Sequence, residues 1–529
     1  MKTNNINVIK ETFQEIADIV TPTMGPKGRM AIISDEMSRP YLTDDGVTVA
    51  KECLNYSDPF KKMVATSMIE ASNNTEKHAF DGTTLTVLLT NELYKDGLKM
   101  IKKKHMHPQL AADEISKEVK EVLKRLDGEK IIIDEANNNT HLVEDVANIT
   151  TKIPAIGTLV TEAYKHAGKG MNVIIEHDRE HPTSSVEHVD GMVIDSGYFT
   201  PELRQLCRNE EGIWEAENAK LFLLSEGILT TNNLKNLFAS IEDLSTPLVF
   251  VMDRNFSPDS LKGLMDNLVN NKLKFMFVFI NDSDPKEIFM DIAARTNGKI
   301  QSAALGTTDY LYEYAGTASK ITVEIDKTTI IASGNKDEIN KRLAAYKKEL
   351  SKNEFTTGYI RADTINRRMS NLDKGLTKIK IATPSITEFR TIRFKLDDAI
   401  GAVRCALKEG VLLGGGKALY SLAKDFPNIK TTLQSPLKTI IQNAGLQLPK
   451  ANVLESKHYG RDARTGLDIN LLKAGIIDSY TSITSALINA CSIATSYLRA
   501  YILINKKHIS HIKEICFLFM YLNSLIIHQ

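Results

Sequence analysis

The sequence is poor in the features that mark secreted, metal-rich and membrane proteins. Its five cysteines lie far apart with no C-x-x-C pair, which argues against a disulfide framework or a zinc site and indicates a reducing compartment. Lys and Arg together number 66, as do Asp and Glu, so no charge excess points to nucleic acid or to a charge-driven partner. No apolar run reaches the length of a membrane span, since the nearest candidate, residues 515–527, is short and interrupted by Asn523 and Ser524.

The pattern of apolar residues changes twice along the 529 residues, a length typical of roughly three or four domain-sized units. The first quarter shows helical spacing, as does the chain from Leu396 onward. Between them, short apolar runs at 221–224, 248–251 and 275–280 alternate with helix-like segments, which predicts an α/β unit with a largely parallel sheet. The helical ends belong either to one domain split by an insertion or to separate domains in series.

The most informative stretch is Asp81-Gly82-Thr83-Thr84, which runs directly into the apolar helix-like segment 87–93. A helix N-terminus offers free N–H groups and a positive dipole end, both of which suit a phosphate. A carboxylate beside an anion site indicates a bridging cation, most simply Mg²⁺. The same tetrapeptide is also an ordinary helix-capping turn, and both interpretations stay open.

Other turn motifs carry the same ambiguity. Residues 25–28 (GPKG) form a tight turn but not a Walker A loop, because the glycines are too close together. Residues 43–49 (TDDGVTV) predict a hairpin turn or a carboxylate that polarises water.

A helix is predicted over 393–410, with Asp397 and Asp398 near its start. Residues 414–416 (GGG) end that helix or admit a nucleoside, and Asp478 lies in a turn or binds a sugar hydroxyl.

Taken together, the order and spacing of these motifs resembles the group I chaperonins, the GroEL-type family, over nearly the whole chain. The matching pieces are 23–29 (TMGPKGR), 45–50 (DGVTVA), 81–84 (DGTT), 396–399 (LDDA), 409–416 (EGVLLGGG) and 475–478 (GIID). The resemblance implies an ATP-dependent molecular chaperone that binds non-native polypeptides and promotes their folding through ATP-driven changes in a ring.

The fold implied by the resemblance is multidomain, α and α/β. A mostly helical equatorial ATP-binding domain is split in sequence between 1–127 and 406–529. A small intermediate hinge domain takes 128–190 and 376–405, and an α/β apical polypeptide-binding domain takes 191–375. Gly191, Gly375 and Gly410 match hinge positions, where glycine absorbs the change in backbone dihedral angles.

The resemblance also implies a site for ATP and Mg²⁺, with K⁺ as a further possible cation. Asp81 would bind the metal, and Asp45 and Asp398 would position and activate the attacking water. Because Asp398 would lie in the intermediate domain, it would reach the site only after hinge closure. The nucleotide-contacting residues would be Thr23, Met24, Gly25, Pro26, Gly82, Thr83, Thr84, Gly415, Asp462, Ala463 and Asp478.

For the apical domain the resemblance implies an apolar surface that binds non-native polypeptides and the mobile loop of a co-chaperonin. The alternative for each matching position is a place in the core. These positions are Tyr198, Leu203, Leu234, Phe238, Ile241, Leu261, Leu264 and Met265. The expected assembly is a heptameric ring, as a double ring, without nucleic acid or stable membrane insertion. The expected location is bacterial cytoplasm or the matrix of a mitochondrion-type organelle.

Several positions depart from the family pattern. Asp44 replaces a lysine near the nucleotide, Leu85 replaces a third threonine, and Glu202 replaces an apical aromatic residue. Asp462 and Arg464 replace small or amide residues that flank the adenine. The resemblance fades toward the apolar tail 497–529, where the family's ends pair strands between subunits. These departures motivate an alternative function, a degenerate chaperonin that acts as a holdase or scaffold with little ATPase activity.

Overall fold

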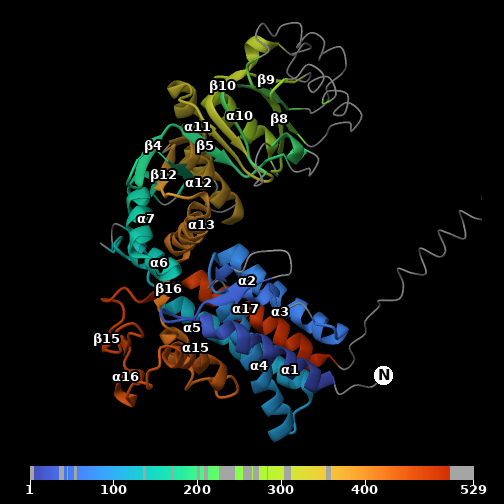
Figure 1. Cartoon of the computed structure of the whole chain (residues 1–529), viewed down its shortest axis with the longest axis vertical. Helices are drawn as coiled ribbons and strands as arrows, with labels where there is room; N and C mark the ends of the chain where they lie inside the picture. Colours follow the sequence, from blue (N-terminus) through green and yellow to red (C-terminus); the bar gives the residue numbers. More distant parts are fainter. Residues whose placement is uncertain are drawn as a thin grey trace, which may run out of the picture. The chain divides into compact units, whose positions relative to one another are not determined.

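The two ends of the chain form one compact unit, and the middle forms another. The computed structural model describes residues 5–500 except 35–40, 44–45, 53–55, 135–136, 138, 169–170, 180, 199–202, 208–211, 226–244, 254–264, 266–272, 283, 303–310, 353–358 and 374. Unit 1 joins Met1–Val160 to Phe394–Gln529, and unit 2 is Thr161–Arg393 (Figure 1). Of the two arrangements that the sequence left open, a helical domain split by an insertion is therefore confirmed.

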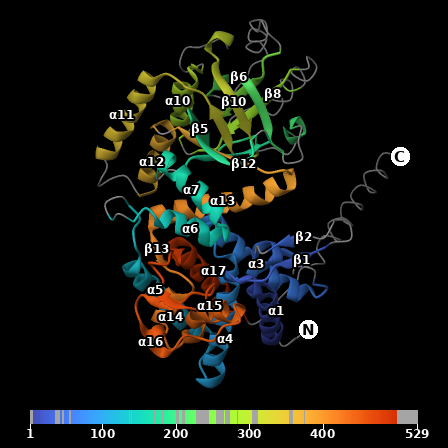
Figure 2. The ribbon, with the colours of Figure 1, turned by 60° about the vertical axis from the view of Figure 1, so that its left-hand side comes forward.

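Unit 1 is mainly helical, as Figure 2 shows from a second side. Its longest helices pack around one large apolar core. The predicted helix after Asp81 is confirmed, and it extends to Lys103. The helices are α1 (Asn5–Val20), α2 (Gly46–Glu52), α3 (Pro59–Ala79), α4 (Thr83–Lys103), α5 (Pro108–Glu129), α6 (Leu142–Thr151), α14 (Lys417–Leu422), α15 (Lys430–Asn443), α16 (Ala451–Glu455) and α17 (Tyr480–Arg499).

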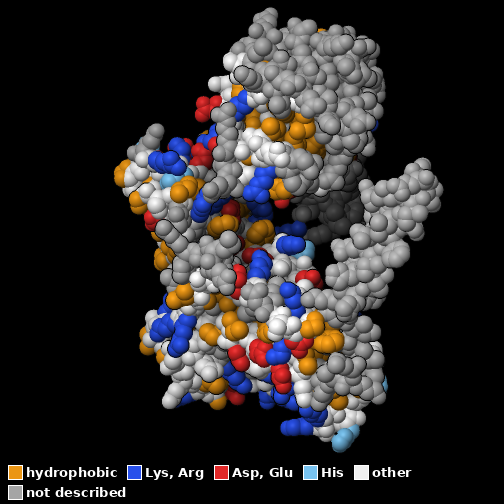
Figure 3. Space-filling model, turned by 45° about the vertical axis from the view of Figure 1, so that its right-hand side comes forward, with side chains coloured by type: hydrophobic (Ala, Val, Ile, Leu, Met, Phe, Trp, Pro, Cys, Tyr) orange, Lys and Arg blue, Asp and Glu red, His pale blue; other side chains and the backbone are white. Residues whose placement is uncertain are grey.

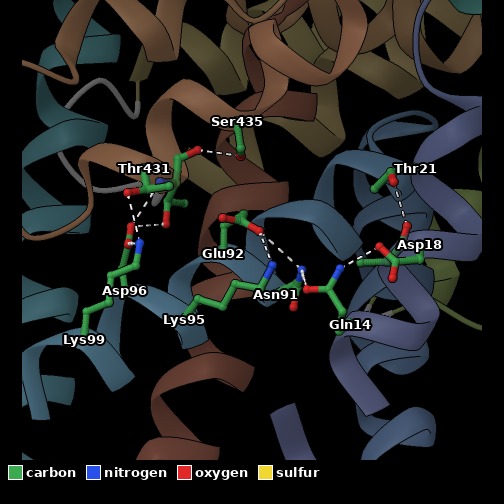
Figure 4. Close-up of polar contacts among 12 residues, drawn as sticks. Gln14, Asp18, Thr21, Asn91, Glu92, Lys95, Asp96, Lys99, Thr431 and Ser435 are labelled. Carbon is green, nitrogen blue, oxygen red and sulfur yellow. Dashed lines mark hydrogen bonds and ion pairs between the residues drawn. The ribbon is translucent and has the colours of Figure 1, made fainter. Parts of the chain in front are cut away.

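Helices α4 and α17 approach closely at Gly97, where a Cβ atom would clash with the Leu498 side chain. This contact joins the N-terminal and C-terminal parts of unit 1. Polar contacts of α4 with α1 and α15 extend the junction (Figure 4). Asp96 is almost fully buried and accepts hydrogen bonds from the backbone N–H and hydroxyl of Thr432 at 3.0 and 2.9 Å. Such charge-assisted bonds hold the two halves of the unit in register.

Unit 1 also contains three short two-stranded sheets among its described residues. They are β1 (Ala31–Ile33) with β2 (Tyr41–Thr43), β13 (Val411–Leu413) with β16 (Ile477–Ser479), and β14 (Tyr459–Arg461) with β15 (Asp468–Asn470). The hairpin interpretation of 43–49 is wrong, because α2 begins at Gly46. Burial of Val49 and Ala50 in the core outweighs the strand preference of the β-branched residues.

Unit 2 contains a seven-stranded sheet in the order β5-β11-β10-β6-β7-β8, with β9 also paired to β6. The strands are β5 (Gly191–Ile194), β6 (Trp214–Leu224), β7 (Leu248–Asp253), β8 (Phe275–Ile280), β9 (Ile300–Gln301), β10 (Gly316–Val323) and β11 (Thr328–Ile331). The three apolar runs expected as strands are confirmed: 221–224 ends β6, 248–251 begins β7, and 275–280 is the whole of β8.

The sheet is mixed, so the prediction of a largely parallel sheet is only partly right. β6, β7, β8 and β9 pair in parallel, whereas β10 and β11 pair antiparallel with each other and with their other neighbours. The antiparallel part was missed because β10 alternates between buried and exposed side chains. Such half-exposed strands are typical of antiparallel sheets and give no continuous apolar run.

A second sheet of unit 2 holds β3 (Val173–Asp178), β12 (Leu376–Ala382) and β4 (Ser185–Val189). The helices of unit 2 are α10 (Pro285–Thr296), α11 (Lys336–Lys352) and α12 (Tyr359–Asp373). Two helices, α7 (Pro154–Ala167) and α13 (Ile386–Glu409), each contribute residues to both units. The helix predicted at 393–410 is confirmed as the larger part of α13.

No helix in the described part of the chain is long and apolar enough to cross a membrane. On the face drawn in Figure 3, acidic and basic side chains are interspersed over the described surface of unit 1.

Candidate functional site

The N-terminal turn at residues 21–29 is held by backbone bonds and by α15. Gly28 donates to the Gly25 carbonyl at 3.1 Å, and Arg29 donates to the Pro22 carbonyl at 2.8 Å. The Asn443 side-chain amide donates to the carbonyls of Thr21 and Met24, at 2.8 and 3.0 Å. Residue 25 has φ +88°, and a Cβ there would lie 3.1 Å from Ile440, so only glycine fits without strain.

The loop Phe80–Gly82 turns from α3 into α4. Gly82 has φ +88° and serves as the N-cap of α4, and it supplies no side chain to bond the first N–H groups of the helix. Those N–H groups have no acceptor within the helix and form its positive end. Thr83 and Thr84 therefore open a helix, which is the arrangement predicted for a phosphate site.

Three segments meet at the hydroxyls of Thr83 and Thr84. The Thr84 hydroxyl lies 3.5 Å from the hydroxyl of Thr23 in the N-terminal turn. A Cβ at Gly46, the first residue of α2, would clash with Thr84 and lie 3.1 Å from the Thr83 hydroxyl oxygen. The start of α2 is thus beside the start of α4. Asp45, the predicted catalytic residue just before it, lies outside the described residues, as does Asp44.

Two carboxyl groups, from Asp81 and Asp478, share this region. Burial raises the pKa of Asp81, while the Gly82 N–H, at 2.6 Å, and the positive charge of Lys152 lower it. Burial, reinforced by the negative charge of Asp81, raises the pKa of Asp478 to about 7, against the effect of a Gly415 N–H bond. Because these like charges influence each other, they disfavour double ionisation, and the region favours a cation.

The glycine segment 414–416 faces Asp478 across the strand pair β13–β16, in which Leu412 pairs with Asp478. Gly415 has φ +64°, and a Cβ there would meet only one methyl group within 4 Å, at 3.7 Å. By contrast, a Cβ at Gly416, which is the N-cap of α14, would clash with the Leu437 backbone. The structure therefore brings Gly415 and Asp478 together, as the sequence analysis expected for a nucleoside contact.

The segment 462–465 forms a turn that is stabilised by its own side chains. The Asp462 carboxylate accepts bonds from the Arg464 N–H and the Thr465 hydroxyl, each at 2.8 Å. Ala463 is buried in a small cluster with Leu437 and Ile441. Ile440, which lines the Gly25 turn, packs on the same cluster, so α15 links the two segments. The Asp462 side chain acts here as a turn cap.

Helix α13 approaches the Phe80–Gly82 loop along one stripe of its surface. A Cβ at Gly401 would clash with the Phe80 ring, and the Cys405 thiol lies 3.4 Å from the His78 carbonyl. Asp398 is seven residues before Cys405 and lies about 20° from it around the helix, and it is half-buried, whereas Asp397 lies about 80° from Cys405 and is exposed. Residues 394–409 of α13 belong to unit 1.

Lysines were missed by the sequence analysis. Lys152, at the end of α6, donates to the Thr23 carbonyl at 3.5 Å. Lys417 is almost fully buried, and its ammonium donates to the carbonyls of Val453 and Leu454 at the end of α16. Neither lysine belongs to a recognisable local motif, because its partners lie far away in sequence.

Of the predicted polypeptide-binding positions, five lie outside the described residues and three are buried or partly buried. Leu234, Phe238, Ile241, Leu261 and Leu264 lie outside the described residues, as does Glu202. Tyr198 and Leu203 are only 2% and 1% exposed, and the Tyr198 hydroxyl donates to the Gly212 carbonyl at 2.8 Å. For these two the surface role is wrong in this structure, since both belong to the sheet core. Met265 is partly buried against the same core.

The predicted hinge glycines occupy tight positions. Gly375 has φ +61° and Gly410 has φ +91°, which only glycine adopts readily. A Cβ at Gly375 would lie 2.8 Å from the Val189 carbonyl oxygen, and one at Gly191 would lie 2.5 Å from the Ile330 oxygen. Because Val189 pairs with Leu376, the chain segments holding Gly191 and Gly375 lie side by side. Their role as hinges stays a prediction.

Comparison with known proteins identifies the family. The model of the TCP-1/cpn60 chaperonin family matches residues 16–236 and 230–508. The chain belongs to the TCP-1/cpn60 chaperonin family. Members of this family are in general ATPases that bind ATP, and chaperonins assemble as oligomeric rings.

Solved chaperonin structures share the fold. The chaperonin gp146 from the bacteriophage EL 2 (Pseudomonas aeruginosa), crystallised in the presence of ATP-BeFx, is 19% identical, with a TM-score of 0.73 over 95% of this chain and 98% of that chain. A second crystal form of gp146 gives 18% identity and a TM-score of 0.67 with the same coverage. The recognition made from the motifs is confirmed, and the fold is a mixed, mostly helical multidomain chaperonin fold with several small sheets.

The glycine at the start of α4 provides a test of this geometry. Gly82→Ala is expected to lower the free energy of unfolding of unit 1 by about 1–2 kcal/mol, the cost of a left-handed backbone for a residue with a Cβ. The added Cβ would also lie 3.1 Å from the Ser482 carbonyl oxygen. Urea denaturation followed by circular dichroism measures the change.

The matched control is Gly128→Ala in helix α5, where a Cβ meets nothing within 4 Å. This variant is expected to leave the stability unchanged or to raise it by up to about 1 kcal/mol. Equal destabilisation by the two substitutions would contradict the strained-turn interpretation of Gly82.

Proposed function

We propose that this chaperonin is an ATP-dependent folding chaperone, which binds and hydrolyses ATP in unit 1 and binds non-native polypeptides in unit 2. The observation that carries the proposal is the convergence of the Thr23–Gly25 turn, the start of α4, and the Gly415–Asp478 pair on one region. These segments come from both ends of the chain, and each offers a group suited to a different part of a nucleotide.

The residues present fit a Mg-nucleotide. Asp81 and Asp478 form a buried carboxyl pair that favours a cation, beside the hydroxyls of Thr83 and Thr84. Within the described residues no group of three or more His, Cys, Asp or Glu is placed to hold a metal by itself. Magnesium is often bound through one or two carboxylates plus phosphate oxygens, which is the arrangement that Asp81 allows. When bound, Mg²⁺ would neutralise charge on the phosphate oxygens.

The remaining steps are assigned to residues of the chain. The free N–H groups at the start of α4 and the hydroxyls of Thr83 and Thr84 bind and orient the phosphates. Asp398, on the stripe of α13 that faces this loop, orients the attacking water together with Asp45. Gly415 lets the nucleoside approach the backbone, and Asp478 accepts a hydrogen bond from a sugar hydroxyl.

The finer assignments follow the family resemblance. We assign the three-domain boundaries, a heptameric double ring, a co-chaperonin and an apical polypeptide-binding surface on that basis. Among the described residues of unit 2, the exposed large apolar side chains are Ile325 and Ile386. Five of the predicted polypeptide-binding positions lie within 226–244 and 254–264, outside the described residues.

A second candidate is a holdase or scaffold with little ATPase activity. Leu85, which replaces a hydroxyl residue, packs against the core of unit 1 and offers no donor to a phosphate. The hydroxyl of Thr86 cannot replace it, because it is buried and bonded to the Gly82 carbonyl and to Thr75. The phosphate loop thus has two hydroxyls available, those of Thr83 and Thr84.

Refolding of a chemically denatured client enzyme separates the two candidates. With Mg-ATP, the folding chaperone is expected to hydrolyse ATP steadily and to raise the yield of active client above the yield with Mg-ADP. A holdase would suppress client aggregation equally with either nucleotide and would show no turnover. ATP hydrolysis no faster than that of the Asp398→Ala variant would contradict the folding-chaperone proposal.

Light scattering coupled to gel filtration of the same sample measures the assembly. A heptamer or a double heptamer of the 58.9 kDa chain is expected. A monomer at micromolar concentration would count against the ring.

A further inference from the structure

Lys152 occupies an unusual place at the end of α6. Its backbone is left-handed, with φ +59°, and its N–H donates to the Asn148 carbonyl at 2.9 Å to close the helix. Glycine or asparagine is the common choice at such a C-terminal position, because a Cβ is disfavoured there. A long cationic side chain at this point projects toward the N-terminal turn, where its ammonium donates to the Thr23 carbonyl at 3.5 Å.

The end of α6 is fixed in place by its packing. Asp145 lies against Gly475, where any Cβ would clash with its carboxylate, so α6 lies directly beside the segment that leads to Asp478. The Thr151 hydroxyl, which is 1% exposed, bonds the Ala147 carbonyl at 2.8 Å. Lys152 therefore starts from a well-anchored backbone.

Charge around the Lys152 ammonium is negative. Its positive charge lowers the pKa of Asp81, against the effect of burial, and Asp81 in turn raises the pKa of Asp478. A region this rich in carboxylates needs positive charge before it can accept the phosphates of a nucleotide.

An ammonium and a potassium ion suit the same oxygens. Both are monovalent, and carbonyl and carboxylate oxygens can replace the water around either one. The Thr23 carbonyl is such an oxygen, and the Asp81 carboxylate lies within the electrostatic reach of Lys152. A tethered ammonium has one advantage over a free ion, because it loses no translational freedom on binding.

We propose that Lys152 is a built-in monovalent cation of the nucleotide site, which takes the place of K⁺ beside Thr23 and Asp81. The inference rests on the proposed nucleotide binding and extends it. Nucleotide binding by this chain then needs Mg²⁺ but not K⁺, so the K⁺ that the family resemblance allows is not required. Lys152 is a positioning residue, because it acts on the phosphates through Asp81 and the Thr23 turn.

Calorimetric titration of the full chain with Mg-ADP tests this, in potassium chloride and in N-methylglucamine chloride of equal ionic strength. For the wild type the Kd is expected to differ by less than about twofold between the two salts. For Lys152→Met the Kd in N-methylglucamine is expected to be at least about tenfold weaker, with most of the loss restored by potassium or ammonium. Lys438→Met is the matched control, since Lys438 bonds Gln434 on α15, and its binding should follow the wild type.

The wild-type titrations need no variant, so they decide the matter even if Lys152→Met folds poorly. A tenfold or larger dependence of the wild-type Kd on potassium would overturn the proposal. So would a Lys152→Met variant that binds as the wild type does in both salts, or one whose loss potassium does not restore, because a structural lysine would give that result. Absence of Mg-ADP binding by the wild type in either salt would overturn the proposed function along with the inference.

Discussion

Replacing Asp398 with alanine is expected to lower kcat for ATP hydrolysis by about 10²–10⁴-fold, the usual contribution of a positioned acid or base. The reason is the stripe of α13 on which Asp398 lies with Gly401 and Cys405, both of which touch the end of α3 beside Asp81. Asp398 is thus placed to orient a water near the phosphate loop, while the groups that bind the nucleotide belong to other elements.

The split between turnover and binding distinguishes this role from a structural one. The Kd of Asp398→Ala for Mg-ADP is expected to stay within about threefold of the wild type, because a group that acts only in the transition state leaves ground-state binding intact. Single-turnover hydrolysis and calorimetric titration measure the two quantities.

Asp397→Ala is the matched control. Asp397 is adjacent in sequence and on the same helix, but it is exposed, whereas Asp398 is half-buried. Its removal is expected to leave both kcat and the Kd unchanged. If the two substitutions lowered kcat to the same extent, the assignment of the water-orienting role to Asp398 would fail.

Replacing Arg342 with methionine is expected to destabilise unit 2 by about 3–5 kcal/mol, the cost of leaving a buried charge without its partner. Arg342 of α11 donates to Asp291 of α10 at 2.9 and 3.0 Å. Asp291 is 1% exposed and also accepts the Tyr346 hydroxyl at 2.8 Å. The guanidinium reaches Glu287 as well, so one side chain ties two helices together.

The loss should depend on pH. Burial raises the pKa of Asp291 to about 6, even though Arg342 and Tyr346 lower it. A carboxyl whose pKa is higher in the folded state stabilises the fold when protonated, and this contribution disappears as the pH rises through the folded pKa. Without Arg342 the folded pKa rises further, so the variant is expected to lose more stability relative to the wild type at pH 8 than at pH 5.

The chain supplies its own probe for this measurement. Its one tryptophan, Trp214, is 4% exposed in the core of unit 2, so the change in its fluorescence during urea denaturation reports this unit. Lys341→Met is the control, because Lys341 pairs with Glu338 on the exposed surface and should change nothing measurable. A double variant, Arg342→Met with Asp291→Leu, should recover much of the loss. Equal losses for Arg342→Met at both pH values would contradict the role given to Asp291.

Sequence reasoning found those parts of the site that are local in the chain. The start of α4 follows from Asp81, Gly82 and the apolar run after them, because capping and helical periodicity act within a few residues. Helix α13 and the apolar strands of unit 2 were found for the same reason. The β-branched segment after Gly46 was misassigned, because its conformation is decided by burial of Val49 and Ala50 in a core that the local pattern does not reveal.

Contacts between residues that are distant in sequence could not be predicted. Lys152 lies 129 residues from Thr23, and nothing in the sequence around residue 152 points to that carbonyl. Tyr198 and Leu203 show the same limit on the apical side, because an apolar residue has the same pattern whether it faces the solvent or the core. In both cases the deciding partner belongs to a distant part of the chain.

The proposed nucleotide site also constrains the order in which the chain folds during its synthesis. It needs Thr23 and Gly25 from one end of the chain and Asp478 from the other, with Asn443 bonded across the N-terminal turn. At about 5–20 residues per second, a ribosome takes roughly half a minute to a minute and a half to make the intervening chain. Unit 2 is contiguous from Thr161 to Arg393 and can fold during that interval. Unit 2 can therefore fold before the proposed site is able to hold its first nucleotide.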